Sequence, residues 1–269
     1  MTDVGTTARP ARVRFGDLWV DALTFDEALA AIERLVDRGE GGAVFTPNVD
    51  HVVLADRDPR FRDAYRRADL SLCDGQPLRW TSRLVGLRIA EKVSGSDLFL
   101  PLMKLAARRR FRVFLFGGSQ EVSEQAAAKL RSELGVNVVG ILAPRIGLEP
   151  TPEEDAIVEQ VRAARADLLV VCLGGHKAEL WIDRVRERLR PAVSLGIGAS
   201  IDFYVGRVRR APRWMQRAGL EWLHRLLQEP RRLARRYLVE DVRFVGIMLR
   251  TLRAPRTERV LPGGPEAAP

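Results

Sequence analysis

Short apolar runs alternate with amphipathic segments along most of this chain of 269 residues. The runs are nearly continuous in Val, Leu, Ile and Phe, which is typical of strands buried on both faces of a parallel sheet. The segments between them predict helices, because their apolar residues recur every three or four positions. The pattern predicts an α/β fold, a Rossmann-like, mostly parallel sheet covered by helices. The predicted strands are 42–46, 70–73, 112–118, 136–142, 167–175 and 192–198.

Helix signals complete this α/β unit. A short hairpin is predicted over 13–23, with its turn near Gly16. Thr24 can cap the first helix, and Asp26 and Glu27 suit the positive end of that helix. The predicted helices are 25–38, 49–57, 59–67, 76–85, 96–109, 119–134, 152–165 and 177–189.

The strand pattern stops near residue 206. Helical segments follow over 213–218, 220–228 and 230–250, and the last stretch is rich in Pro, Gly and Ala, which predicts disorder. The chain is therefore expected to divide into a flexible N-terminus, an α/β catalytic domain, a basic helical appendage and a disordered tail. These parts are 1–12, 13–205, 206–250 and 251–269.

The positive charge is concentrated near the end of the chain. The whole chain carries +9, whereas the stretch from Arg207 to Arg259 contains fifteen arginines, no lysine and five acidic residues, a net +10. The rest is nearly neutral. This asymmetry indicates a phosphate-bearing partner, and composition leaves open an anionic lipid, a nucleic acid or a diphosphate substrate.

Several classes of protein and site are disfavoured. No signal-peptide-like segment and no apolar run of about 18 residues is present, so we expect a cytoplasmic protein that does not span a membrane. Cys73 and Cys172 lie in apolar runs and are expected to be buried thiols. The three histidines and two cysteines have no metal-ligand spacing, so no metal and no cofactor is expected.

Polar side chains follow the first two predicted strands of the sheet. Thr46 and Asn48 follow one strand, and Asp74 and Gly75 follow the next. If the strands are neighbours, these groups share one cleft, since ligands bind at the carboxyl ends of the strands in open α/β sheets. Asp74 comes directly after an apolar run and can act as a base if it is partly desolvated. The alternative is an ordinary Asp-Gly turn or a helix cap.

Glycines follow three of the later strands. Gly117 and Gly118 precede a capped helix, where backbone N–H groups can bind phosphate, although tight turns also need glycine. The GIGASI segment has Ile201 at the third glycine position of a dinucleotide-binding motif, which argues against a nicotinamide cofactor. His176, Lys177 and Glu179 follow another strand, where His176 alone suits a polar rim residue.

Seven motifs, in this order, resemble one protein family. They are TPNVDHVVLADRD (46–58), ADLSLCDGQPL (68–78), KVSGSDLF (92–99), VFLFGGS (113–119), LGGHKAELWI (173–182), GIGASIDFYVGRVRRAP (196–212) and GLEWLHRLLQEPRRLARRYL (219–238). Their order and the last block make the resemblance specific. Over residues 13–245 the chain resembles the WecG/TagA/CpsF family of bacterial glycosyltransferases, glycosyltransferase family 26.

The resemblance implies a reaction and its partners. A sugar would pass from a UDP-sugar to a polyprenyl-diphosphate-linked sugar at the cytoplasmic face of the membrane, with inversion and without a metal. The implied donor sugars are N-acetylmannosamine, its uronic acid or a related hexose, and the products are cell-surface polysaccharides or teichoic-acid-type polymers. The resemblance also implies that the chain can form homo-oligomers.

The resemblance further assigns roles to residues. Asp74 matches the proposed general base, and Thr46 and Asn48 match polar pocket residues. Lys92 stands where arginine is usual, which removes a bidentate fork, and Ala178 stands in a segment that usually carries a pocket glutamine. Substrate-binding roles are further expected for Gly95, Asp97, Gly117, Gly118, Lys177, Glu179 and Asp202. The tail arginines matched to the active site are Arg225, Arg232 and Arg235.

The basic tail itself allows several interpretations. Leu220, Leu223 and Leu227 recur at helical spacing, so the helices are amphipathic and suit an anionic membrane surface or packing on the body. Deletion from residue 207 onward is then expected to leave a folded body without transfer activity or membrane affinity. The alternatives are a basic-tailed nucleic-acid-binding or regulatory protein and a nucleotide-sugar epimerase or dehydrogenase. The arginines alternate with a leucine face, which argues against nucleic acid as the partner.

Overall fold

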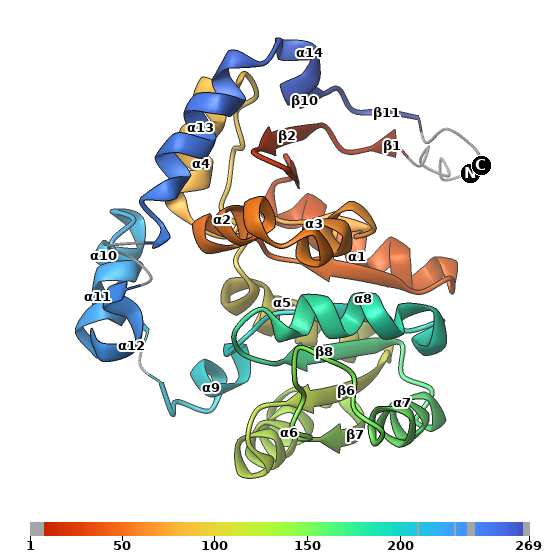
Figure 1. Ribbon diagram of the computed structural model, residues 1–269. Helices are drawn as coiled ribbons and strands as arrows, with labels where there is room; N and C mark the ends of the chain where they lie inside the picture. The colour runs from red at the N-terminus through yellow and green to blue at the C-terminus, as the bar shows by residue number, and fades with distance from the viewer. Residues whose placement is uncertain (1–7, 209, 229, 236–239, 266–269) are drawn as a thin grey trace.

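The computed structural model describes residues 8–265 except 209, 229 and 236–239. It does not describe the side chains of Ala8, Arg213, Arg217, Arg225, Arg232, Arg235 and Pro265. Its centre is a six-stranded, all-parallel sheet in the order β5-β4-β9-β8-β6-β7, which confirms the predicted α/β class (Figure 1). The strands are β4 (Gly42–Phe45), β5 (Leu70–Ser71), β6 (Arg112–Gly117), β7 (Asn137–Leu142), β8 (Leu168–Cys172) and β9 (Val193–Gly196).

Helices cover both faces of this sheet, because successive strand residues point to opposite faces. Val44 and Leu115 belong to the cluster on one face, and their neighbours Phe45 and Phe116 belong to the cluster on the other. The first face is covered by α1 (Phe25–Arg38), α5 (Gly95–Arg109) and α6 (Gln120–Leu134). The second is covered by α2 (Val49–Arg57), α3 (Pro59–Arg66), α7 (Glu154–Ala163) and α8 (Lys177–Leu189).

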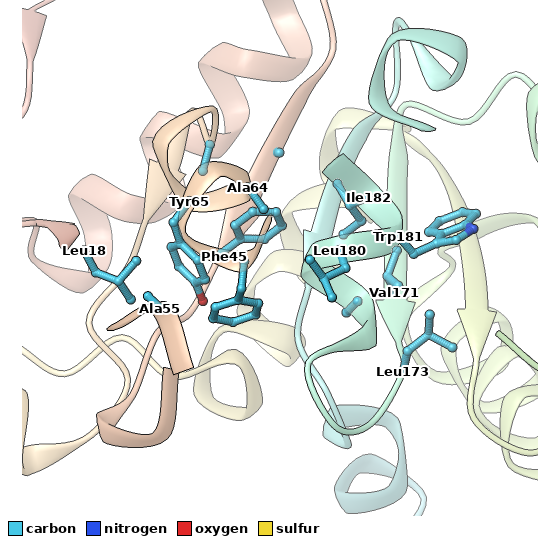
Figure 2. Close-up of a cluster of buried hydrophobic side chains, with 14 of the residues drawn as sticks. Leu18, Phe45, Ala55, Ala64, Tyr65, Val171, Leu173, Leu180, Trp181 and Ile182 are labelled. Carbon is cyan, nitrogen blue, oxygen red and sulfur yellow. The ribbon is translucent and has the colours of Figure 1, made fainter. Parts of the chain in front are cut away.

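The second face carries the aromatic core. Figure 2 shows Phe45 and Tyr65 within the same cluster as Leu180 and Trp181. The Phe116 and Trp181 rings stack with centroids 4.1 Å apart. Local signals agree with this packing: Thr24 accepts from the Glu27 N–H in a capping box at the start of α1, as expected.

A smaller antiparallel sheet lies beside the parallel one. It has the order β10-β2-β3, from β10 (Val260–Leu261), β2 (Arg12–Phe15) and β3 (Leu18–Asp21). The hairpin of β2 and β3 confirms the expected hairpin at 13–23. A further pair joins β1 (Ala8–Arg9) to β11 (Gly264–Pro265), so both ends of the described chain meet at one side (Figure 1).

The remaining helices form the side of the molecule that includes the basic tail. They are α4 (Gln76–Val85), α9 (Ser200–Tyr204), α10 (Arg213–Arg217), α11 (Glu221–Gln228), α12 (Pro230–Arg235), α13 (Arg243–Arg253) and α14 (Arg256–Arg259). In Figure 1, α13 runs alongside α4, and α10 to α12 lie near one end of that pair.

The C-terminal part differs from the expected division at residue 250. Phe244, Ile247 and Met248 of α13 are buried in the same core cluster as the second face of the sheet. Thr251 accepts a hydrogen bond from the Gly16 N–H at 2.9 Å, and β10 pairs with β2. Residues 251–265, expected to be disordered, therefore form helix and strand. The apolar spacing of α13 suits a protein core as well as a membrane, and here the core covers it.

Candidate active site

The first pocket lies where β4, β8 and β9 end. Its volume is about 220 Å³. Thr46 and Asn48 follow β4, Leu173 to His176 follow β8, and Ile197 to Ser200 follow β9. Gln228 and Leu233 reach it from α11 and α12, so the tail helices close one side of this pocket. The expectation of a cleft at the carboxyl ends of the strands is met.

Thr46 and Asn48 are held by neighbouring backbone. The Thr46 hydroxyl donates to the Gly196 carbonyl at 3.4 Å and ties the ends of β4 and β9 together. The Asn48 side chain accepts from the His51 N–H at 3.3 Å and caps α2. Both side chains line the pocket with little freedom, which suits residues that orient a ligand.

Asp74 follows β5 and lies beside Asn48. Its backbone N–H donates to the Pro47 carbonyl at 2.9 Å, so the turns after the two neighbouring strands are joined. Gly75 follows at φ 118°, a conformation that favours glycine, and begins α4. The carboxylate is half-buried and lines the first pocket.

A second pocket of about 360 Å³ adjoins the first. Asn48, Asp74 and Ser96 line both. The second pocket is bounded by the start of α4 on the body side and by α11 and α13 on the tail side, where Trp222 and Phe244 contribute apolar surface. Asp74 therefore lies on the wall between two cavities, of which the first is lined mainly by polar surface and the second mainly by apolar surface.

Glu179 is a second carboxylate of the first pocket. Burial raises its pKa, and the nearby charge of Asp50 acts in the same direction. Its side chain is 5% exposed, so a protonated carboxyl that can donate a hydrogen bond is favoured more than for an ordinary surface glutamate.

Two histidines line the same pocket as Glu179. His176 Nε2 is 3.0 Å from an Asp50 carboxylate oxygen, and His51 Nδ1 is 2.9 Å from the Tyr65 hydroxyl. Potential ligand atoms of Asp50, His51 and His176 lie within 4.8 Å of one another, so this is a group that could hold a metal ion. The expectation that the reaction needs no metal remains a prediction. Sequence spacing missed the group because its members come from two separate strand ends.

Lys92 lies next to the tail and not in the lining of either pocket. Its Nζ is 3.2 Å from Asp97 and 2.7 Å from Glu221 of α11. Burial alone would lower the pKa of Lys92, but the hydrogen bond to Glu221 and the nearby charge of Asp74 raise it overall. Lys92 is therefore favoured in its charged form, and its charge is paired with two carboxylates.

The other predicted residues divide into two groups. Gly95 lines the first pocket, and a Cβ there would lie 3.0 Å from Ile197, so the close approach explains the glycine. Gly117 and Gly118 line neither pocket, have positive φ and pack so tightly that a Cβ would meet neighbours at 2.8 and 2.9 Å. Tight packing accounts for both of these glycines.

Lys177 and Asp202 also line neither pocket. The side chains of Arg225, Arg232 and Arg235 fall outside the part of the chain that the structure describes. Pocket residues that the sequence did not single out include Ser96, Gly174, Gly175 and Gly198. All but Ser96 lie at the carboxyl ends of predicted strands, and that position is the signal that could have identified them.

The fold and the pockets define a class of protein. A parallel α/β sheet carries two adjoining cavities at its carboxyl edge, with a half-buried carboxylate between them, which is an arrangement for an enzyme that joins two substrates. The sequence model of the WecG/TagA/CpsF glycosyltransferase family matches residues 13–258, and the chain belongs to that family.

The match confirms the predicted resemblance and extends it through α13, in agreement with the burial of that helix. The protein is therefore a glycosyltransferase of cell-surface polysaccharide synthesis, which requires a sugar donor and an acceptor. No helix among the described residues is long and apolar enough to cross a membrane.

Proposed function

We propose that the protein is an inverting, metal-independent hexosyltransferase. It transfers N-acetylmannosamine, its uronic acid or a related hexose from a UDP-sugar to a polyprenyl-diphosphate-linked sugar. One observation carries the proposal: Asp74 lines both cavities. A base for direct transfer must touch the acceptor hydroxyl while that hydroxyl faces the anomeric carbon of the donor, and a carboxylate on a shared wall meets this requirement.

The donor is assigned to the first cavity. Thr46, Asn48 and Glu179 supply hydrogen-bonding groups there, and the glycine-containing turns after β8 and β9 allow close approach of a diphosphate to the backbone. The acceptor sugar is assigned to the second cavity, where Trp222 offers an apolar face.

The chemistry then needs one proton transfer. Asp74 takes the proton of the acceptor hydroxyl as its oxygen bonds to the anomeric carbon, and UDP leaves from the opposite face with the bonding electron pair. Inversion follows from this single displacement. Positive charge from the arginine-rich tail favours the departing diphosphate.

The proposed acceptor is carried by a membrane lipid, and one side of the molecule suits an anionic bilayer. Helices α4, α10 and α13 contain seven arginines and no Asp, Glu or Lys. Among the described residues, eight of the eleven exposed large apolar side chains lie on these helices, on α11 or at the N-cap of α13. They are Trp80, Leu84, Trp214, Trp222, Leu227, Val242, Val245 and Leu249.

This combination supports peripheral association with the inner face of the membrane. Arginine alone would suit nucleic acid equally well, but exposed tryptophan, leucine and valine between the arginines favour a lipid interface.

A donor screen tests the function. The full-length protein is incubated with a panel of UDP-sugars and a short-chain prenyl-diphosphate-N-acetylglucosamine acceptor, with and without EDTA, and products are identified by mass spectrometry and by NMR of the anomeric proton. Transfer of one hexose with inversion and without loss in EDTA supports the proposal. Retention of configuration, or transfer only with an added divalent metal, would contradict it.

A further inference from the structure

Four charged side chains join the α/β body to the C-terminal helices. Lys92 and Asp97 belong to the body, and Arg210 and Glu221 belong to the tail. Lys92 Nζ lies 2.7 Å from Glu221 and 3.2 Å from Asp97. Arg210 lies 2.8 Å from Asp97 and 3.4 Å from Glu221. Each cation thus touches both carboxylates, and two of the four contacts cross from body to tail.

The charges in this group, called here the body–tail clamp, compensate one another. Two cations alternate with two carboxylates, and their side chains are between 11% and 29% exposed. Buried or half-buried charges are stable when each is paired and hydrogen-bonded, whereas removal of one partner leaves a charge without compensation. The loss of a single carboxylate therefore weakens the whole group.

The clamp lies beside the second cavity. Glu221 lines that cavity and is the first residue of α11, so its contact with Lys92 joins the start of that helix to the body. Trp222 follows on the same wall. Gly219, two residues before Glu221, packs so close to Trp80 of α4 that a Cβ there would come within 2.5 Å of the ring. The residues of the tail-side wall of the second cavity thus include Glu221 of the clamp and its neighbours along the chain.

We propose that Glu221 and Arg210 are positioning residues that hold the tail-side wall of the second cavity against the body through Lys92 and Asp97. They act through the placement of α10 and α11, without taking part in the bond change. The effect on acceptor binding rests on the proposed function, whereas the effect on the tail helices does not.

Hydrogen exchange of the full-length protein tests the clamp directly. In Glu221→Gln and Arg210→Gln, amides of residues 213–228 should exchange about tenfold faster than in the unaltered chain, which corresponds to a loss of about 1.4 kcal/mol. Arg210→Lys keeps the charge and should give an intermediate rate. The matched control is Glu154→Gln, which breaks the Arg184–Glu154 pair inside the body, a pair of similar burial.

The control should leave exchange over residues 213–228 unchanged. Unchanged exchange in Glu221→Gln and Arg210→Gln, or equal acceleration in Glu154→Gln, would overturn the proposal. Circular dichroism and thermal unfolding establish that each variant is folded before exchange is compared.

Kinetics separate the clamp from the proposed function. Glu221→Gln should raise KM for the prenyl-diphosphate acceptor about tenfold and KM for the UDP-sugar by no more than about threefold. Glu221 and Trp222 at the start of α11 line the second cavity, whereas only Gln228 at its far end lines the first. Equal effects on both KM values would contradict the positioning role. If the unaltered protein transfers no sugar, the proposed function fails, and the exchange rates still decide whether the clamp holds the tail.

Discussion

The substitution Asp74→Asn gives the sharpest test of the reaction mechanism. Asparagine has nearly the same shape but cannot take a proton from a hydroxyl at neutral pH. The turn that carries residue 74 is held by the backbone bond from its N–H to the Pro47 carbonyl at 2.9 Å, and this bond does not depend on the carboxylate. The variant should therefore fold normally, with a stability change of about 0.5 kcal/mol or less.

The expected loss is in the chemical step. General-base catalysis typically contributes about 10²- to 10⁴-fold, which corresponds to about 2.7–5.4 kcal/mol of barrier. The assay measures kcat for transfer to the prenyl-diphosphate acceptor and the Kd for UDP, which should change by less than about threefold. The control is Asp58→Asn, at the N-cap of α3 away from both pockets, where asparagine also caps well and kcat should not change.

Two results would count against the assignment of Asp74 as the base. An Asp74→Asn variant that turns over at the unaltered rate would mean that another group removes the proton. A large fall in thermal stability would mean that the carboxylate supports the fold, and the kinetic loss could then not be read as catalysis.

Three further predictions concern the membrane surface, the core and pH. Trp80→Glu should reduce cosedimentation with vesicles containing phosphatidylglycerol, whereas Leu148→Glu, at another exposed site, should not. Equal binding of the two variants to the vesicles would exclude α4 from the membrane contact. Phe244→Ala should lower the free energy of unfolding by about 3 kcal/mol in urea titrations, and an unchanged midpoint would contradict the packing of α13 in the core. Burial, opposed by the charge of Arg12, raises the pKa of Asp21 from 3.8 to about 6. The unfolded chain therefore loses this proton at a lower pH than the folded protein does. The stability that this group contributes falls as pH rises from about 4 to about 6. The unfolding free energy should therefore have a less negative slope over this window in Asp21→Asn, and parallel curves for the two proteins would refute the shift.

The structure changes the design of truncation experiments. The sequence predicted that deletion from residue 207 onward would leave a folded body, but that deletion removes the buried side chains of α13 and the strand β10 that pairs with β2. A truncated chain would expose core surface and lose the β10 strand of its small sheet, leaving the β2–β3 hairpin. Loss of activity in such a chain would report unfolding as much as loss of the tail, so point variants on the exposed faces are the better test.

Much of the site was predictable from sequence because strand ends are visible in the pattern. Thr46, Asn48 and Asp74 directly follow apolar runs, and the carboxyl ends of neighbouring parallel strands meet at one edge of the sheet. The same reasoning placed Glu179 near this edge. It did not separate glycines that line a pocket from Gly117 and Gly118, because a turn needs glycine in both cases.

The amino-acid sequence by itself determined the alternation of strands and helices, the polar groups at the strand ends and the family. The tertiary structure alone decided what covers each apolar face and which charges meet. A helical apolar stripe such as that of α13 shows which face avoids water, but a core and a bilayer satisfy it equally. Lys92 and Glu221 are separated by 129 residues in the sequence, and no local sequence pattern encodes a contact between residues so far apart. The contact exists because the fold returns the tail to the edge of the sheet.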